Sequence, residues 1–288
     1  MYDNSTGDNN VAIGYTALND NTIGNNNTAL GTQALENSLH GSRNVAVGNS
    51  ALNNMSFNNS GAVYNAYNTA VGFEALAICN PNDGNSTGTG KRNTAVGGLA
   101  LDGLTTGKMC TGIGFNCSTT ATADNATALG YNAIATADNN VRVGNTAVVG
   151  IFGAVNFNTS DARFKTDVAD NVPGLSFVDK LRPVTYLFQK EKYSLHIGEG
   201  QDEDYVAKLR AQDASGKRSS GFLAQEVEAL ADSLGYDFDG IYKPQNKQDT
   251  YGLGYAQFVV PLVKAVQELK AMVEAQQKRI TELERLAR

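Results

Sequence analysis

Short apolar stretches alternate with polar turns through the first half of the chain, and nearly the same phrase recurs. The copies are NVAIGYTAL, NTALGTQAL, NVAVGNSAL, NTAVGFEAL and NTAVGGLAL, followed by weaker ones up to about residue 150. A glycine closes each apolar stretch, and these glycines are Gly14, Gly31, Gly48, Gly72, Gly97, Gly114, Gly130 and Gly144. Their separations are 17, 17, 24, 25, 17, 16 and 14 residues. Alternation that ends at a glycine predicts a short strand and then a corner in each copy.

A unit of this size buries too little apolar surface to be stable alone, so the copies are expected to stack as a solenoid. Small side chains recur at equivalent places, which indicates close backbone approach; they are Ala17, Ala34, Ala51 and Ala75. The asparagines that begin the repeats are expected to cap turns or to stack as ladders. The two long separations predict loops at 53–67 and 79–92. These loops either contact a receptor or are simply tolerated extra length.

The pattern changes after Ser160, where charges become dense and helix signals begin. The stretch PGLSFVDKLRPVTYLF predicts a short helix up to Leu181 and then a strand through Tyr186 and Phe188, because the residue before a proline avoids helical geometry. The stretch SGFLAQEVEALADSLG predicts a strand that enters an amphipathic helix stopped by Gly235. Residues 191–219, between these two stretches, are predicted to form a hairpin or an exposed arm.

A heptad pattern closes the chain. Valine, isoleucine and alanine recur seven apart at Val259, Val266, Val273, Ile280 and Ala287, and Leu262, Leu269, Gln276 and Leu283 interleave with them. This spacing predicts a coiled coil of about four heptads. Pro261 is tolerable only in the first turn, so the helix is expected to begin close to it. For parallel coils, β-branched residues at a with leucine at d favour two strands.

Composition excludes several classes of protein. The 288 residues are 41% hydrophobic, which is too apolar for a disordered chain, and the net charge of −6 with no basic cluster excludes a nucleic-acid partner. No apolar run approaches a membrane span, and the first ten residues lack the features of an export signal. The chain is therefore expected to be a fragment or to leave the cell without a signal. Cys79, Cys110 and Cys117 lack zinc-site spacing and are expected to be buried free thiols, with a Cys110–Cys117 disulfide as the alternative.

The repeats closely resemble the YadA-like head repeat of trimeric autotransporter adhesins and phage tail fibres, on the motif NTAVGxxAL. This resemblance implies a left-handed β-roll in which three chains pack side by side. The periodicity by itself predicts only a solenoid. The homotrimer, three strands in the terminal coil, and a location on a virion tail fibre or a cell surface follow from the likeness.

The second half resembles the C-terminal intramolecular chaperone of phage endosialidase tailspikes, also called the peptidase S74 domain and shared with the myelin regulatory factor. The matching motifs are SDARFK, LRPVTYLF, GFLAQEVEAL and YAQFVVPLVKAVQELKAMV, in that order from residue 160 to about 273. The resemblance implies a domain that cleaves itself, with Ser160 attacking the carbonyl of Thr159 and Lys165 accepting the hydroxyl proton. A serine needs such a base, and lysine can be one only where burial disfavours its charged form.

The same motifs contain further candidate residues. Asp161 and Arg163 are expected to hold the bend or to pair with each other, rather than to transfer protons. A bend is needed because five residues of straight strand would place Ser160 and Lys165 on opposite faces. Gln225 and Glu226 either support the site or satisfy buried backbone at a strand-to-helix turn. His196 is expected to play no part.

These observations predict a β-solenoid over residues 1–159, an α+β chaperone core over 160–258 and a coiled-coil helix over 259–288. The expected function is a trimeric fibre or adhesin segment whose chaperone drives assembly and then cleaves at Thr159–Ser160. The alternatives are a structural fibre that does not cleave, or a tip that binds a receptor or glycan through the long loops. No cofactor, metal ion or membrane insertion is expected, and no other catalytic motif is present.

Overall fold

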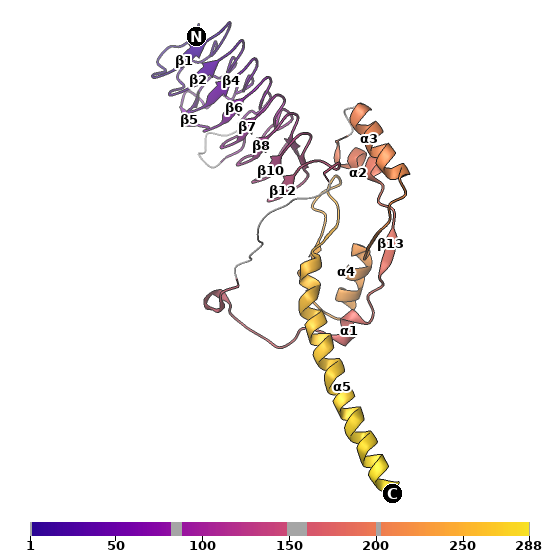
Figure 1. The fold of residues 1–288 in the computed structure, drawn as a ribbon. Coiled ribbons are helices and arrows are strands. Elements are labelled where there is room, and N and C mark those ends of the chain that lie inside the picture. Colours follow the sequence, from indigo (N-terminus) through magenta and orange to yellow (C-terminus); the bar gives the residue numbers. More distant parts are fainter. Residues whose placement is uncertain (1, 82–87, 149–159, 200–202, 288) are drawn as a thin grey trace. The chain divides into compact units, whose positions relative to one another are not determined.

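The computed structural model describes residues 2–81, 88–148, 160–199 and 203–287 (Figure 1). The chain divides into two compact units. The first comprises residues 1–151 together with 189–214, and the second comprises 152–188 together with 215–288. Each unit is described separately.

The first unit is built on an eight-stranded parallel sheet with one three-residue strand per repeat. The strands follow one another in chain order, so each repeat forms one layer of a solenoid (Figure 1). They are β1 (Val11–Ile13), β2 (Thr28–Leu30), β4 (Val45–Val47), β6 (Thr69–Val71), β7 (Thr94–Val96), β8 (Thr111–Ile113), β10 (Thr127–Leu129) and β12 (Val141–Val143). The repeat pattern thus correctly predicted a stack of short strands, and the structure shows that they pair in parallel.

The register aligns equivalent residues of successive repeats. Ala29 lies opposite Ala12 on one side and Ala46 on the other, and Ala46 lies opposite Ala70. From β2 to β10 the central residue of each strand points into the interior, and Ala29, Ala46 and Ala70 are fully buried. The first and third residues of the strands point outward. The interior is therefore narrow, and small side chains are required at the centre of each strand.

The recurring glycines are required by stacking as well as by the turn. Gly31 has φ of 138°, and a Cβ added to it would overlap the carbonyl oxygen of Gly48 in the next layer. Gly14, Gly48, Gly72 and Gly97 meet the same obstacle in their own next layers. Any side chain at these corners would separate adjacent layers.

Buried asparagines form the ladder expected at the repeat starts. The Oδ1 of Asn44 accepts from the backbone N–H of Asn68, and the Oδ1 of Asn68 accepts from that of Asn93. The Nδ2 of Asn68 donates to the carbonyl of Gly90 at 2.8 Å. Cys110 takes the next place in the row, where its N–H donates to Asn93 Oδ1. These bonds satisfy backbone groups that would otherwise be buried without a partner.

The first long loop is partly built into the core. Within residues 53–67, Met55 and Tyr64 are buried, and strand β5 (Tyr64–Asn65) pairs in parallel with β3 (Gly41–Ser42). Lys91, at the end of the second loop, is buried with its Nζ 5.2 Å from the centre of the Tyr64 ring. Residues 82–87 of that loop lie outside the described residues. Two further short strands, β9 (Ser118–Thr119) and β11 (Ile134–Ala135), pair in parallel.

Residues 189–214 pack with the solenoid, where they form two helices, α2 (Lys190–Ile197) and α3 (Glu203–Ala214). Glu199, between them, is buried and accepts hydrogen bonds from Arg142 Nη2, the Thr146 N–H and the Tyr205 hydroxyl at 3.1, 3.1 and 2.7 Å. The prediction of a hairpin or exposed arm was therefore wrong for this stretch. The helices have little separation of polar and apolar faces, so periodicity gave no signal.

The second unit surrounds a small aromatic core. Its elements are the short helix α1 (Leu175–Val178), the antiparallel pair β13 (Val184–Tyr186) and β14 (Ser219–Gly221), helix α4 (Ala224–Ser233), the antiparallel pair β15 (Ile241–Tyr242) and β16 (Gly252–Leu253), the 3₁₀ turn η2 (Tyr255–Phe258) and helix α5 (Val259–Leu286). Phe177, Val227, Phe238 and Phe258 are buried together. The predicted helix–strand and strand–helix segments are both present.

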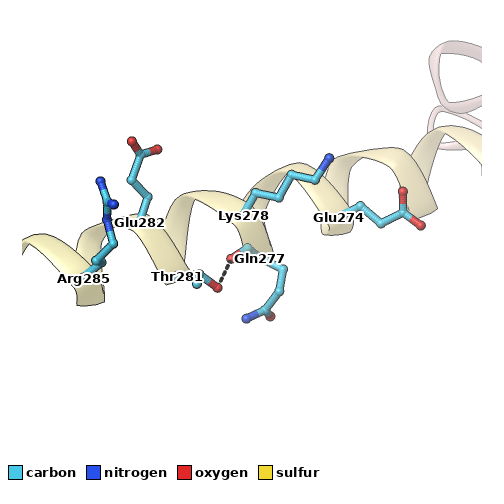
Figure 2. Close-up of a pocket in the computed structure, with 6 residues that line it drawn as sticks. All are labelled: Glu274, Gln277, Lys278, Thr281, Glu282 and Arg285. Atoms are coloured by element: carbon cyan, nitrogen blue, oxygen red, sulfur yellow. Dashed lines mark hydrogen bonds between the residues drawn. The ribbon is translucent and has the colours of Figure 1, made fainter.

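Helix α5 carries the heptads. The a and d residues on it are exposed in the single chain; they are Val259, Leu262, Val266, Leu269, Val273, Ile280 and Leu283. Figure 2 shows another face of the same helix, where Glu274, Lys278 and Glu282 extend outward and the Thr281 hydroxyl donates to the Gln277 carbonyl at 3.0 Å. These polar residues occupy heptad positions outside the a/d row, so the apolar seam is bordered by a polar face over this C-terminal stretch of the helix.

Candidate active site

A single 3₁₀ turn shapes the start of the second half. The turn η1 (Ala162–Phe164) begins at Asp161, whose Oδ1 accepts from the backbone N–H of Arg163 at 2.9 Å. The Arg163 guanidinium returns to the same carboxylate, with Nη2 2.6 Å from Oδ2. This pairing lowers the pKa of the Asp161 carboxyl, chiefly through the side-chain hydrogen bond from Arg163. Asp161 and Arg163 thus hold the turn through backbone and side-chain contacts at once.

The turn places Lys165 beside Ser160. The Nζ of Lys165 donates to the Oγ of Ser160 at 2.8 Å. A straight strand would have pointed these side chains to opposite faces, so the bend at Ala162–Phe164 is what brings them into contact. The distance lies within the range required between a nucleophile and its base. For proton transfer the bond must reverse, with a neutral amine accepting from the hydroxyl.

The surroundings of this pair are open to solvent in the single chain. Ser160 and Lys165 are exposed, and so are two nearby apolar side chains, Phe164 at 77% and Val168 at 83%. Desolvation is what disfavours a charged lysine. The described residues of one chain do not supply it here. Thr159, which would contribute the attacked carbonyl, lies outside the described residues.

The other candidates lie elsewhere in the fold. Glu226, in the first turn of α4, forms an ion pair with Arg182, whose Nε lies 3.0 Å from Glu226 Oε2. The hydrogen bond from Arg182 lowers the pKa of the Glu226 carboxyl. Gln225 is exposed on the same helix, and His196 is exposed on α2. Glu226 thus joins two of the quoted motifs, LRPVTYLF and GFLAQEVEAL.

Arg182 was not among the residues singled out from the sequence. Its partner is 44 residues away along the chain, and no periodic pattern connects them. The sequence offered one indication of this pair: Arg182 and Glu226 have opposite charges, and each lies in a quoted motif next to apolar positions that form the core. Such a pair tethers the strand entry to the helix start.

Among the described residues, no group of three or more His, Cys, Asp or Glu side chains is arranged to hold a metal ion. None of the helices in the described part combines the length and apolar character needed to cross a membrane. Cys79, Cys110 and Cys117 are all buried and free, as expected, and the alternative disulfide is not formed.

Comparison with known proteins gives one match. Residues 160–236 match the family model described as chaperone of endosialidase. The match begins at Ser160 and includes three of the four quoted motifs, while the fourth lies beyond its end. No curated protein matches the chain. The match supports an intramolecular chaperone role for this part of the chain, in a family with autoproteolytic capacity in general.

Proposed function

We propose that this chain is a segment of a trimeric fibre or adhesin, carried on a virion tail or a cell surface. Its second half assembles three copies and then severs itself between Thr159 and Ser160. Ser160 is the nucleophile and Lys165 the base. The observation that carries the proposal is the 2.8 Å hydrogen bond between Lys165 Nζ and Ser160 Oγ at the first residue of the matched region.

The reaction needs only groups of this chain and water. Ser160 Oγ attacks the Thr159 carbonyl carbon while its proton passes to the neutral amine of Lys165. The C–N bond to the Ser160 nitrogen breaks, and that nitrogen takes a proton from Lys165. Water then hydrolyses the ester, so the products are residues 1–159 with a new carboxylate and residues 160–288 with a new amino group.

Two exposed apolar surfaces support assembly with further copies. One is the row of outward side chains on the eight-stranded sheet, where exposed members are Val11, Ile13, Leu30, Val45, Val71, Val96, Ile113, Val141 and Val143. The other is the seam of α5, where Val266 and Val273 are 64% and 57% exposed. Apolar rows of this length are rare on the surface of monomers. Packing of three copies would bury both.

Assembly explains why the site is open in one chain. Phe164 and Val168, one and three residues from Lys165 along the chain, present exposed apolar surface, and a neighbouring copy packed against them would exclude water from the amine. Cleavage would then follow assembly. Similar repeats can pair out of register, and a terminal coil that gathers three chains makes correct registration a local event. Removal of the chaperone leaves a fibre held by a high unfolding barrier.

The proposal is tested by denaturing electrophoresis of the full chain and of Ser160→Ala and Lys165→Ala, with Lys180→Ala as a control for loss of an exposed lysine. Wild type and Lys180→Ala are expected to give two fragments, and the two dyad variants a single band near 30.5 kDa. A single band for the assembled wild-type protein would favour the rival, a structural fibre that keeps its chaperone.

A further inference from the structure

A groove lies along the last layers of the solenoid, on the other side of the glycine corner from the strand face. It has a volume of about 560 Å³. Its walls include Phe115 and Asn116 after β8, Tyr131 and Asn132 after β10, Asp102 from the preceding layer, and Gly198 at the end of α2. The size is that of a small-molecule site. All of these residues belong to the first unit.

The floor carries two parallel aromatic rings. Phe115 and Tyr131 are stacked, with ring centroids 6.2 Å apart and planes 16° from parallel, and they are 54% and 45% exposed. Gly98 lies against the Phe115 ring, since a Cβ added there would meet ring atoms Cδ2 and Cε2 at 3.3 and 3.4 Å. The Tyr131 ring is also supported edge-on by Tyr205. The two rings, called the platform below, are therefore nearly parallel and held in place by their neighbours, and about half of each side chain is exposed.

Polar groups lie beside this platform. The Nδ2 of Asn116 donates to Asn132 Oδ1 at 2.8 Å, which fixes both amides. Asn132 is only 2% exposed, and its Nδ2 donor has no hydrogen-bond partner among the described residues. Burial raises the pKa of the Asp102 carboxyl, so this group lies in a partly desolvated position. A buried donor without a partner carries a free-energy cost that a ligand acceptor would remove.

We propose that this groove binds a neutral carbohydrate. One apolar face of a sugar ring lies on the Phe115–Tyr131 platform, and its hydroxyl groups bond to Asp102 and to the Asn116 and Asn132 amides. Aromatic rings offer a flat apolar surface at low entropic cost, while carboxylate and amide groups accept from and donate to hydroxyls. A carboxylate in the wall and a net charge of −6 disfavour an anionic sugar.

The groove is separate from the surfaces that the proposed function uses. The assembly face is formed by the outward residues of the strands, which precede the glycine corner, whereas Phe115 and Tyr131 directly follow Gly114 and Gly130. It is also separate from the loops at 53–67 and 79–92. Binding here rests on neither cleavage nor the dyad.

The test is a printed array of neutral oligosaccharides built from glucose, galactose and N-acetylhexosamines, with their sialylated counterparts beside them. The probe is the full chain carrying Ser160→Ala, so that one defined species is measured whether or not the wild type cleaves. Phe115→Ala removes one ring of the platform, and Asp102→Asn replaces the carboxylate that is proposed to accept hydrogen bonds from the sugar hydroxyls. Phe73→Ala is the matched control, because Phe73 is 52% exposed on the same solenoid but does not line the groove.

The expected result is retention on at least one neutral glycan. Affinity should fall at least about tenfold in Phe115→Ala and in Asp102→Asn and stay unchanged in Phe73→Ala. Circular dichroism confirms that each variant is folded. The proposal is overturned if the protein binds no neutral glycan on the array, even when it is applied at millimolar concentration. It is also overturned if only sialylated glycans bind, or if binding to the neutral glycan survives Phe115→Ala. Failure of a thiol-specific label to modify the assembled Phe115→Cys variant would overturn it as well.

Discussion

The Lys165 amine lies 2.8 Å from the Ser160 hydroxyl across a turn of three residues, and both groups remain open to solvent in the single chain. The contact between the proposed base and the proposed nucleophile is thus local, since it depends only on the Asp161-capped turn. What the single chain lacks is the desolvated surrounding. In the proposed mechanism, the pair therefore forms within one chain and becomes active only when a neighbouring copy excludes water from it.

The Asp161-capped turn is expected to control the rate of cleavage. In Asp161→Ala the Arg163 N–H and guanidinium lose their acceptor, so Lys165 is held less often on Ser160. The rate of cleavage during refolding, measured by electrophoresis of samples taken over time, is expected to fall by about tenfold. Asp161→Asn keeps an acceptor for the N–H and should be intermediate. Asp170→Ala, an exposed carboxylate beyond the turn, should cleave normally; a normal rate for Asp161→Ala would remove Asp161 from the account.

The layer spacing of the solenoid depends on its corner glycines. Gly31→Ala would place a Cβ on the Gly48 carbonyl in a left-handed conformation, and a loss of about 2–6 kcal/mol in unfolding free energy is expected. Gly103→Ala is the control, because its added Cβ would have only Ser118 Oγ near, at 4.0 Å. It should change stability by less than about 0.5 kcal/mol. Equal thermal midpoints for the two variants would contradict the stacking explanation.

The buried thiols make the free energy of unfolding depend on pH. Burial raises the pKa of Cys79 to about 12 and that of Cys117 to about 11, whereas a thiol in an unfolded chain ionises near about 8.5. Their contribution to stability is therefore complete below about pH 8.5 and is lost as the pH rises towards 11 and 12. A chromogenic disulfide reagent at pH 8 should leave the native protein unreacted and titrate three thiols in denaturant. Rapid reaction of the native protein would show that the thiols are accessible.

The seam of α5 should control assembly. Val273→Asp places a carboxylate in the apolar row of every copy, and the association constant is expected to fall at least about a hundredfold. Thr281→Asp introduces the same charge on the polar face shown in Figure 2 and should change association little. Sedimentation equilibrium measures both. A wild-type chain that stays monomeric at all concentrations would contradict the trimer.

The β-solenoid could be predicted from the sequence because the same pattern of apolar residues, glycine and alanine recurs through the repeats. Glycines and alanines at fixed offsets predicted strands and corners correctly, although the reason for the glycines, contact with the next layer's carbonyl, needed three dimensions. Helices α2 and α3 were missed because their polar and apolar faces are poorly separated and because they contact residues far away in sequence, such as Arg142, whose Nη1 donates to the Tyr193 hydroxyl at 3.1 Å. The Arg182–Glu226 pair was missed for the second of these reasons. The approach of Ser160 and Lys165 was expected from the family resemblance and not from their spacing, because five residues of straight strand would place the two side chains on opposite faces.

The most direct measurement is the mass of the assembled wild-type protein by mass spectrometry under denaturing conditions, with sequencing of any new amino terminus. The account predicts two fragments that together account for the chain, the smaller beginning at Ser160, and an intact 30.5 kDa species only for Ser160→Ala and Lys165→Ala. An intact wild-type chain in a correctly formed trimer would contradict it.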